Sequence, residues 1–336
     1  MSGEGVKKVA VVPGDGIGPD VVESALAVLQ AAGAELSLIP LEVGLCRWKR
    51  TGVALADEDL ETIKECDCVL LGAITTPPDP DYRSVLLRLR KTLDLYANIR
   101  PFRSHDLDFI IVRENTEGLY SGLEEVGVEE SRTLRVITRR GSERIAEAAC
   151  DLATSRQKLT IVHKSNVLRS DRLFLQTCRE VAERRGVPYD DMLVDAAAYN
   201  LVVNPQRFDV LVTTNLFGDI LSDEAAGVVG SLGLCASANV GASRALFEPI
   251  HGSAPDIAGK GIANPIGAIR SAAMMMEWLG EPVTARRIEA AVQRALADGV
   301  RTPDLGGNSH TAEVTRAVAG YLMEECGSLS IGVMRD

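Results

Sequence analysis

Short apolar runs rich in β-branched residues alternate along the chain with longer segments in which apolar residues recur every three to four positions. The short runs predict buried strands at 8–14, 66–73, 108–115, 159–165 and 208–216. The longer spacing predicts helices at 19–32, 57–65 and about 141–156, 170–185, 264–279 and 283–299. Strands that alternate with helices are typical of an α/β fold with a largely parallel sheet.

The segment at about 118–140 has a different pattern, because polar and apolar residues alternate there over two short stretches. This alternation predicts a two-stranded ribbon. The exposed edges of such a ribbon favour pairing with another chain. An arm that clasps a second subunit and a simple surface hairpin both fit the pattern.

Composition restricts the class of protein. A chain of 336 residues is long enough for about two domains. Hydrophobic residues make up 46% of it, yet no apolar run reaches the ~18 residues that span a bilayer, so we expect a soluble protein without a membrane partner. The N-terminus shows no cleavable leader pattern. Seven scattered cysteines, an odd number, favour reduced thiols in the cytoplasm over disulfides or a metal site.

The formal net charge of −11 disfavours nucleic acid as a partner, since binding there depends on Lys and Arg neutralising phosphates. One basic segment stands out against this acidic background, with Arg83, Arg88, Arg90, Lys91, Arg100, Arg103 and Arg113. A solvated charged face is one interpretation of this segment. The other is a site for a small polyanionic substrate, because arginine binds carboxylates with a bidentate fork.

A glycine-rich loop, PGDGIGP at 13–19, lies between the first predicted strand and the first predicted helix. The dinucleotide fingerprint needs glycine at its first, third and sixth positions, and here Pro19 stands at the sixth. Asp15 also brings a negative charge to the place where phosphates would approach. The loop therefore predicts a tight turn rather than a phosphate-binding loop.

Polar residues follow several predicted strands, and open α/β sheets bind ligands beyond the carboxyl ends of their strands. These residues are Arg113, Tyr120, Lys164, Asn166, Asn215, Asp219 and Asp223.

Four of these positions could carry chemistry. Asp219 and Asp223 are four apart, so in a helix they share one face and suit a hard cation such as Mg²⁺ or Mn²⁺. An acidic pair that complements a helix dipole is the alternative. Lys164 could transfer a proton or be structural, and Tyr120 could be a general acid or a buried phenol.

The chain carries six motifs in the order and spacing of a known family: GDGIGP, LDLYANIRP, RENTEGLY, HKSNVL, TTNLFGDILSD and HGSAPDIAGKGIANP. From about residue 8 to 310 it resembles the β-decarboxylating dehydrogenases, which include isocitrate, 3-isopropylmalate and homoisocitrate dehydrogenases. The resemblance implies an isopropylmalate-dehydrogenase-like two-domain α/β fold with a central, mostly parallel sheet, and not a classical Rossmann fold. The large cofactor-binding domain would comprise 1–98 and 236–336, and the small domain 99–235 with the metal and substrate residues and the arm.

For the cofactor the resemblance implies NAD, bound mainly by HGSAPDIAGKGIANP. A carboxylate at Asp256 would accept hydrogen bonds from a free ribose diol and repel a 2′-phosphate, and NADP-using relatives generally have lysine and tyrosine in place of Asp256 and Ile257. The other implied cofactor-binding residues are Ile17 on the adenine, His251 beside the adenosine, Gly252, Ser253 and Ala254 near the phosphates, and Asn264 at the adenine edge.

For the reaction the resemblance implies oxidation of a 3-substituted malate and loss of CO₂. Arg90, Arg100 and Arg113 would bind the malate carboxylates, with Asn166 also in the substrate site, and Asp195, Asp219 and Asp223 would hold Mg²⁺ or Mn²⁺. Lys164, coupled to Asp195, would take the hydroxyl proton, and Tyr120 would protonate C3. Lys164 and Asp195 are expected from the neighbouring subunit, which implies a homodimer, or a tetramer built from dimers.

The particular substrate is expected to depend on Arg83, Ser84, Leu86 and Leu87. Leu86 replaces the asparagine of isocitrate enzymes, which disfavours isocitrate. The leucine pair resembles isopropylmalate enzymes, but Arg83 replaces their glutamate. An apolar pocket with a cation at its rim favours homoisocitrate or a longer homologue, with 3-isopropylmalate the alternative and isocitrate or tartrate more remote. A noncatalytic regulatory subunit is the rival of another class, although such subunits typically lose a catalytic residue and none is lost here.

Overall fold

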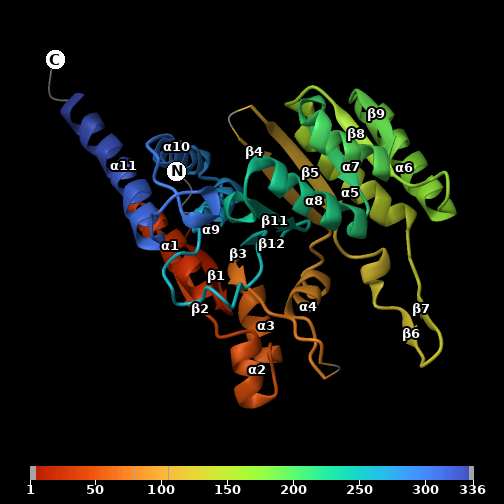
Figure 1. Ribbon diagram of the computed structural model, residues 1–336, viewed down its shortest axis with the longest axis horizontal. Coiled ribbons are helices and arrows are strands. Elements are labelled where there is room, and N and C mark those ends of the chain that lie inside the picture. Colours follow the sequence, from red (N-terminus) through yellow and green to blue (C-terminus); the bar gives the residue numbers. More distant parts are fainter. Residues whose placement is uncertain (1–4, 80, 105, 333–336) are drawn as a thin grey trace. The chain divides into compact units, whose positions relative to one another are not determined.

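The computed structural model describes residues 5–79, 81–104 and 106–332, and the chain divides into two compact units (Figure 1). Unit 1 is built from the segment up to Leu89, from Ser231–Ala238 and from Ala245 onward. Unit 2 comprises Arg90–Gly230 and Asn239–Arg244. Each unit is described below by itself.

The strands of unit 1 follow the order β2-β1-β3-β12-β11. They are β1 (Lys7–Gly14), β2 (Leu36–Pro40), β3 (Cys68–Ala73), β11 (Ala236–Val240) and β12 (Ala245–Pro249). The last two residues of β11, Asn239 and Val240, belong to unit 2. The pairings of β1 with β2, β1 with β3 and β3 with β12 are parallel. Every residue of β3 is buried, as expected for a central strand of a parallel sheet.

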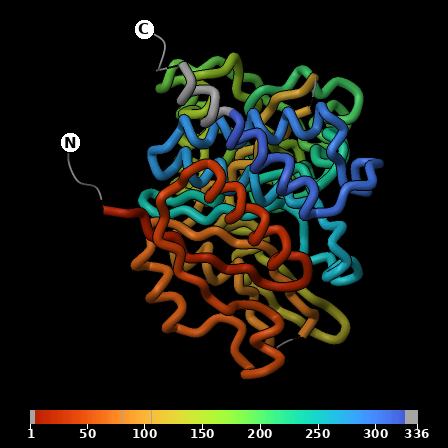
Figure 2. Tube along the Cα trace, turned by 90° about the vertical axis from the view of Figure 1, so that its left-hand side faces the viewer, coloured from red at the N-terminus to blue at the C-terminus, as the bar shows by residue number. Residues whose placement is uncertain are grey.

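Helices from both ends of the sequence pack together in unit 1 (Figure 2). Helix α1 lies against α9 and α11, and α10 packs on both α9 and α11. The helices of this unit are α1 (Gly18–Ala31), α2 (Leu45–Thr51), α3 (Asp57–Lys64), α9 (Ile266–Trp278), α10 (Pro282–Ala297) and α11 (Thr311–Gly332). Helix α4 (Val85–Thr92) runs from unit 1 into unit 2.

The strands of unit 2 follow the order β4-β5-β10-β8-β9. They are β4 (Ala97–Arg103), β5 (Asp108–Glu114), β8 (Leu159–His163), β9 (Tyr189–Leu193) and β10 (Val210–Thr213). The pair β4 and β5 is antiparallel, and the other pairs are parallel. The helices are α5 (Arg139–Thr154), α6 (Arg169–Arg185), α7 (Val194–Val203) and α8 (Asn215–Val229).

The alternation of side chains along β5 separates a hydrophobic core from a polar face. Ile110 and Val112 belong to the core beneath α5 and α6, together with Phe174 and Cys178 of α6. Since successive strand residues point to opposite faces, Arg113 lies on the other face, where α8 packs. This geometry brings a charged strand residue against a helix that carries aspartates.

The predicted helices and strands are confirmed, with ends that shift by a few residues, and so are the mostly parallel sheet and the ribbon. The ribbon consists of β6 (Glu124–Val126) and β7 (Ser131–Thr133), which pair antiparallel. Several elements lacked a clear pattern and were not predicted, among them the edge strands β2 and β9, the short helix α2, and β4 with its antiparallel pairing. In the described part of the chain, no helix has both the length and the apolar character needed to cross a membrane.

Candidate active site

Arg113 is the centre of the polar cluster in unit 2. Its side chain is only 2% exposed and lies against the first turns of α8. The guanidinium donates from Nε and Nη2 to Oδ1 of Asn215, at 3.1 and 2.7 Å, and from Nη1 to Oδ1 of Asp219. Helix α8 therefore holds the predicted substrate-binding arginine in a fixed orientation.

Two further predicted arginines lie close by. Arg100 is next to Arg113 because β4 pairs antiparallel with β5, and its Nη1 is 3.6 Å from Oδ1 of Asp219. Its Nε donates to Oδ1 of Asn98 at 2.5 Å. Arg90, on α4, is also buried, and its charge also acts on Asp219. The structure thus brings the three arginines predicted to bind carboxylates around one aspartate.

Asp219 and Asp223 lie one turn apart on α8, and their environments separate their pKa values. Burial acts to raise the pKa of Asp219, but Arg113, then Arg100, together with the hydrogen bond from Tyr120, hold it below its ordinary value. Burial raises the pKa of Asp223, and the negative charge of Asp219 adds to this. A cation between them would offset the free-energy cost of burying the two carboxylates and the repulsion between their charges.

Tyr120 completes this cluster from the 3₁₀ turn Leu119–Ser121. Its hydroxyl donates to Oδ2 of Asp219 at 2.8 Å, and its ring centroid is 5.5 Å from the guanidinium carbon of Arg113. Burial raises the pKa of Tyr120, and the hydrogen bond to Asp219 raises it further. Tyr120 therefore keeps its proton at neutral pH, as a general acid must.

Two buried polar residues support the cluster: Asn215, which the sequence analysis named only as a polar residue after a predicted strand, and Glu114, which it missed. Asn215 is 1% exposed and joins Arg113 to the Tyr120 loop, since its Nδ2 donates to the Glu117 carbonyl at 3.2 Å. Glu114 accepts from the backbone N–H groups of Thr116 and Glu117, both at 2.9 Å, and so shapes the same loop. The motifs RENTEGLY and TTNLFGDILSD contain these residues, but the contact of Asn215 with the Glu117 carbonyl joins positions 98 apart and is not visible in the sequence.

Lys164 and Asp195 form a separate pair in unit 2. Lys164 follows the end of β8, and Asp195 lies in the first turn of α7. Lys164 Nζ is 2.5 Å from Asp195 Oδ1, and this hydrogen bond lowers the pKa of Asp195. The predicted coupling of these two residues is present within one chain, and Asn166 is exposed on the same loop.

The three predicted metal ligands do not meet in a single chain. Among the described residues, no group of three or more Asp, Glu, His or Cys side chains is arranged to hold a metal ion. Asp219 and Asp223 form one half of the predicted ligand set, and Asp195 belongs to the other half with Lys164.

In unit 1, the glycine-rich loop is a structural turn. Asp15 is 3% exposed, and its carboxylate accepts from the backbone N–H groups of Leu45, Cys46 and Thr75 at 2.9, 3.0 and 3.0 Å. The acid therefore joins the loop to the start of α2 and to the segment after β3. It does not face outward, toward a phosphate.

The glycine-rich loop also contacts the segment predicted to bind the cofactor. Ile17, which is buried, donates its backbone N–H to the Ser253 carbonyl at 2.8 Å. A Cβ at Gly16 would lie 1.9 Å from that carbonyl oxygen, so only glycine allows the approach. Ser253 Oγ is also 2.6 Å from Thr75 Oγ1, and Ala254 adopts a positive φ of 37°. The structure brings these predicted cofactor residues together.

The remaining residues predicted to bind the cofactor differ in their exposure and in the hydrogen bonds they already make. Nε2 of His251 is buried without a hydrogen-bond partner among the described residues, and burial lowers the pKa of this histidine. Asp256 and Gly252 are exposed and Ile257 is partly buried, on the loop after β12. The Asn264 side chain is already engaged, since Nδ2 donates to Asp304 and Oδ1 accepts from the backbone of Ile266. The unsatisfied His251 nitrogen is the feature that best fits a bound nucleotide.

The segment predicted to select the substrate begins α4. Ser84 stabilises the start of this helix, because its Oγ accepts from the Leu87 N–H at 3.4 Å. Arg83 is exposed, whereas Leu86 and Leu87 are partly buried. Tyr82, just before them, is buried beside Trp48, with the ring centroids 5.5 Å apart.

A model of the "Isocitrate/isopropylmalate dehydrogenase" family matches residues 8–318, and the chain belongs to this family. It is 44% identical to a homoisocitrate dehydrogenase of Methanocaldococcus jannaschii, over 95% of this chain and 98% of that protein. It is 47% identical to a 3-isopropylmalate/3-methylmalate dehydrogenase of the same organism, over 95% and 99%. A crystal structure of isocitrate dehydrogenase from Methylococcus capsulatus superimposes with a TM-score of 0.90, at 46% identity, over 95% and 100%.

The family assignment confirms the resemblance found in the sequence and the α/β fold inferred from it. It places the chain among the dehydrogenases, which are oxidoreductases. The relatives bear names for several different acids, so family membership leaves the substrate of this chain open.

Proposed function

We propose that this protein is an NAD- and divalent-metal-dependent dehydrogenase that oxidises and decarboxylates a 3-substituted malate, giving a 2-oxo acid and CO₂. The observation that carries the proposal is the cluster around Asp219, in which three arginines and Tyr120 surround a helix with two aspartates. Arginines suit carboxylates and paired aspartates suit a hard cation, so the cluster matches a substrate that chelates a metal through its carboxylate and hydroxyl.

The residues of this chain would divide the work as follows. Arg90, Arg100 and Arg113 would bind the carboxylates of the acid. Lys164 would accept the hydroxyl proton, with Asp195 holding its Nζ in place. When bound, the cofactor supplies a hydride acceptor, and the cation supplies a Lewis acid for the carbonyl of the β-keto acid. Tyr120, which keeps its proton at neutral pH, would return a proton to C3.

A homodimer with shared active sites is part of the proposal. Large apolar side chains are exposed on α7 and α8: Tyr199 at 67%, Val202 at 61% and Ile220 at 58%. The β6–β7 ribbon adds Val126 at 83% and Val128 at 106%. Exposed apolar surface of this kind supports burial against a second copy, which would bring its Lys164 and Asp195 to the cluster around Asp219.

We propose homoisocitrate or a longer homologue as the acid. The support is the combination at the start of α4, where the exposed guanidinium of Arg83 lies three and four residues before the partly buried Leu86 and Leu87. A cation beside an apolar surface suits an aliphatic chain that ends in a carboxylate. The leucine pair by itself would also suit the isopropyl group of 3-isopropylmalate, which is the second candidate.

The test is NADH formation by the purified protein with Mg²⁺ and each of homoisocitrate, 3-isopropylmalate, isocitrate and tartrate. We expect the highest kcat/KM with homoisocitrate and NAD. The highest value with 3-isopropylmalate would favour the second candidate. No turnover with any of the acids would reject the proposal and favour a regulatory subunit of the same fold.

A further inference from the structure

A fully buried carboxylate holds the backbone at the predicted proton-transfer lysine. Asp171, in the first turn of α6, is 0% exposed, and its Oδ2 accepts from the backbone N–H of Lys164 at 2.7 Å. The Lys164 carbonyl in turn accepts from the N–H groups of Val167 and Leu168, at 3.1 and 2.9 Å. Both backbone polar groups of Lys164 are therefore fixed, independently of the bond between its side chain and Asp195.

The guanidinium of Arg135 balances the charge of Asp171. Arg135 Nη1 lies 2.5 Å from Asp171 Oδ1 and donates to Ser170 Oγ at 2.7 Å. Its Nη2 donates to Thr214 Oγ1 at 3.1 Å, and its guanidinium carbon is 5.4 Å from the centroid of the Phe217 ring. Thr214 is the residue that precedes α8, so Arg135 joins the Lys164 segment to the start of the helix that carries Asp219.

We propose that Asp171 and Arg135 are positioning residues that fix Lys164 for proton transfer. The inference rests on the proposed function, because it takes Lys164 as the proton acceptor. A buried carboxylate is costly to keep without a partner, so the pair has one stable arrangement. That arrangement sets the start of the Lys164 side chain relative to α8, and a displacement of about 1 Å at a reacting group can cost about 100-fold in rate.

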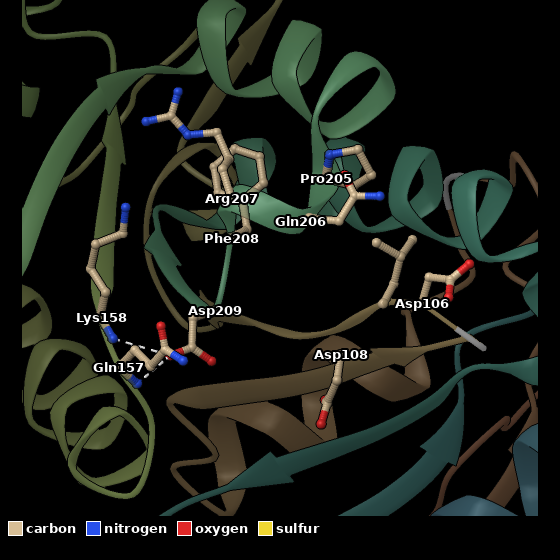
Figure 3. Close-up of a pocket in the computed structure, with 10 residues that line it drawn as sticks. Asp106, Asp108, Gln157, Lys158, Pro205, Gln206, Arg207, Phe208 and Asp209 are labelled. Carbon is tan, nitrogen blue, oxygen red and sulfur yellow. Dashed lines mark hydrogen bonds between the residues drawn. The ribbon is translucent and has the colours of Figure 1, made fainter.

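The chain offers a matched control at the other end of β8, the strand that ends just before Lys164. Asp209 also pairs with an arginine, since Arg156 Nη1 donates to its Oδ1 at 2.8 Å. Asp209 Oδ2 accepts from the backbone N–H groups of Gln157 and Lys158, just before β8, at 2.5 and 3.0 Å (Figure 3). Both aspartates accept hydrogen bonds from backbone amides beside β8, and each is also paired with an arginine. Of the two, only Asp171 binds the amide of Lys164.

The experiment compares Asp171→Leu and Asp171→Asn with Asp209→Leu and Asp209→Asn in the full-length protein. Asp171→Leu should lower kcat by about 100-fold with little change in KM for the acid or NAD, because it displaces a proton acceptor and leaves the substrate arginines in place. Asp171→Asn keeps an acceptor for the Lys164 N–H and should recover most of the loss. Both Asp209 variants should keep a wild-type kcat.

Amide hydrogen exchange gives a readout that does not depend on turnover. The Lys164 amide should exchange faster in Asp171→Leu than in the wild type, and at the wild-type rate in Asp209→Leu. If Asp171→Leu does not fold, Arg135→Met tests the same bridge through the same two measurements. An Asp171→Leu or Arg135→Met protein with wild-type kcat, or with an unchanged Lys164 amide, would overturn the inference. If the wild-type protein is inactive on every acid, the proposed function is rejected. The exchange data would still test whether Asp171 and Arg135 hold the Lys164 amide.

Discussion

Both carboxylate oxygens of Asp219 have partners, Arg113 at Oδ1 and the Tyr120 hydroxyl at Oδ2. Asp219 is therefore both a predicted metal ligand and an ion-pair partner of Arg113, the arginine expected to bind substrate. The positive charges of three arginines act on Asp219 and offset its repulsion of Asp223. This explains how two aspartates one turn apart are tolerated on a partly buried helix face.

Arg83 provides the sharpest test of substrate choice. If its guanidinium binds a distal carboxylate, Arg83→Glu should reduce kcat/KM for homoisocitrate by about 100-fold or more and that for 3-isopropylmalate far less, since a repulsive charge replaces an attractive one. Steady-state kinetics with both acids would measure this. Arg316→Glu, at an exposed cation on α11, is the charge control. Equal losses with both acids would remove Arg83 from the specificity argument.

Asp256 provides the corresponding test for the cofactor. Asp256→Lys together with Ile257→Tyr should shift the ratio of kcat/KM for NAD and NADP toward NADP, because a cation would attract the 2′-phosphate that a carboxylate repels. Asp256→Asn alone removes the repulsion without adding an attraction, so it should weaken the NAD preference only. An unchanged ratio in the double variant would contradict the assignment.

The sequence identified the charged residues of the site more readily than the residues that hold them. Arg113, Lys164 and Asp219 belong to distinctive motifs, and their chemistry is visible from residue type. Asp15 could be recognised only as an acid in a glycine-rich loop, because the amides it binds lie 30, 31 and 60 positions away. Asp171 gave no signal for a different reason: the amide it binds is only seven positions away, but a buried acid and a surface acid look alike in sequence.

Among the elements, the β6–β7 ribbon is the one whose role depends on a second chain. Val126→Asp with Val128→Asp should weaken dimerisation, because it places charges on exposed apolar positions that a partner would cover. Sedimentation and size-exclusion measurements would detect a shift toward monomer, and activity should fall with it. Glu129→Gln, also on the ribbon, should change neither. An intact dimer in the double variant would favour a simple surface hairpin.

Elements with strong patterns were predicted, and those defined by their neighbours were not. Helix α5 has a clear apolar face, and β1 and β5 are apolar runs. Strand β9 reads YDDML and is at the edge of its sheet, half exposed, so it lacks the apolar signal of a central strand. Strand β4 reads ANIRPFR and has no apolar run, and its antiparallel pairing with β5 depends on contacts that its composition does not indicate.

For the whole molecule, shared active sites predict complementation between inactive variants. Lys164→Ala and Asp219→Ala should each be inactive as homodimers. A mixed dimer would contain one site with both changes and one with neither, because each chain would contribute to two sites. After unfolding and refolding as an equal mixture, about a quarter of the wild-type activity should return. Recovery should be absent when the two variants are refolded separately and then combined without exchange of subunits.

Failure of the refolded mixture to regain activity would contradict the shared site and require Lys164 to act within its own chain. Size-exclusion of the refolded mixture would show whether dimers had formed. This distinguishes a wrong site assignment from poor refolding.

The contact between Arg113 and Asp219 links the affinities of two ligands. Under the proposed function, a divalent ion must draw Asp219 away from Arg113, and the acid must draw Arg113 away from Asp219. Binding of the first ligand, ion or acid, includes the free-energy cost of separating Arg113 from Asp219. The second ligand binds a residue that is already separated from its partner. By thermodynamic reciprocity, the acid must strengthen magnesium binding by the same factor by which magnesium strengthens binding of the acid.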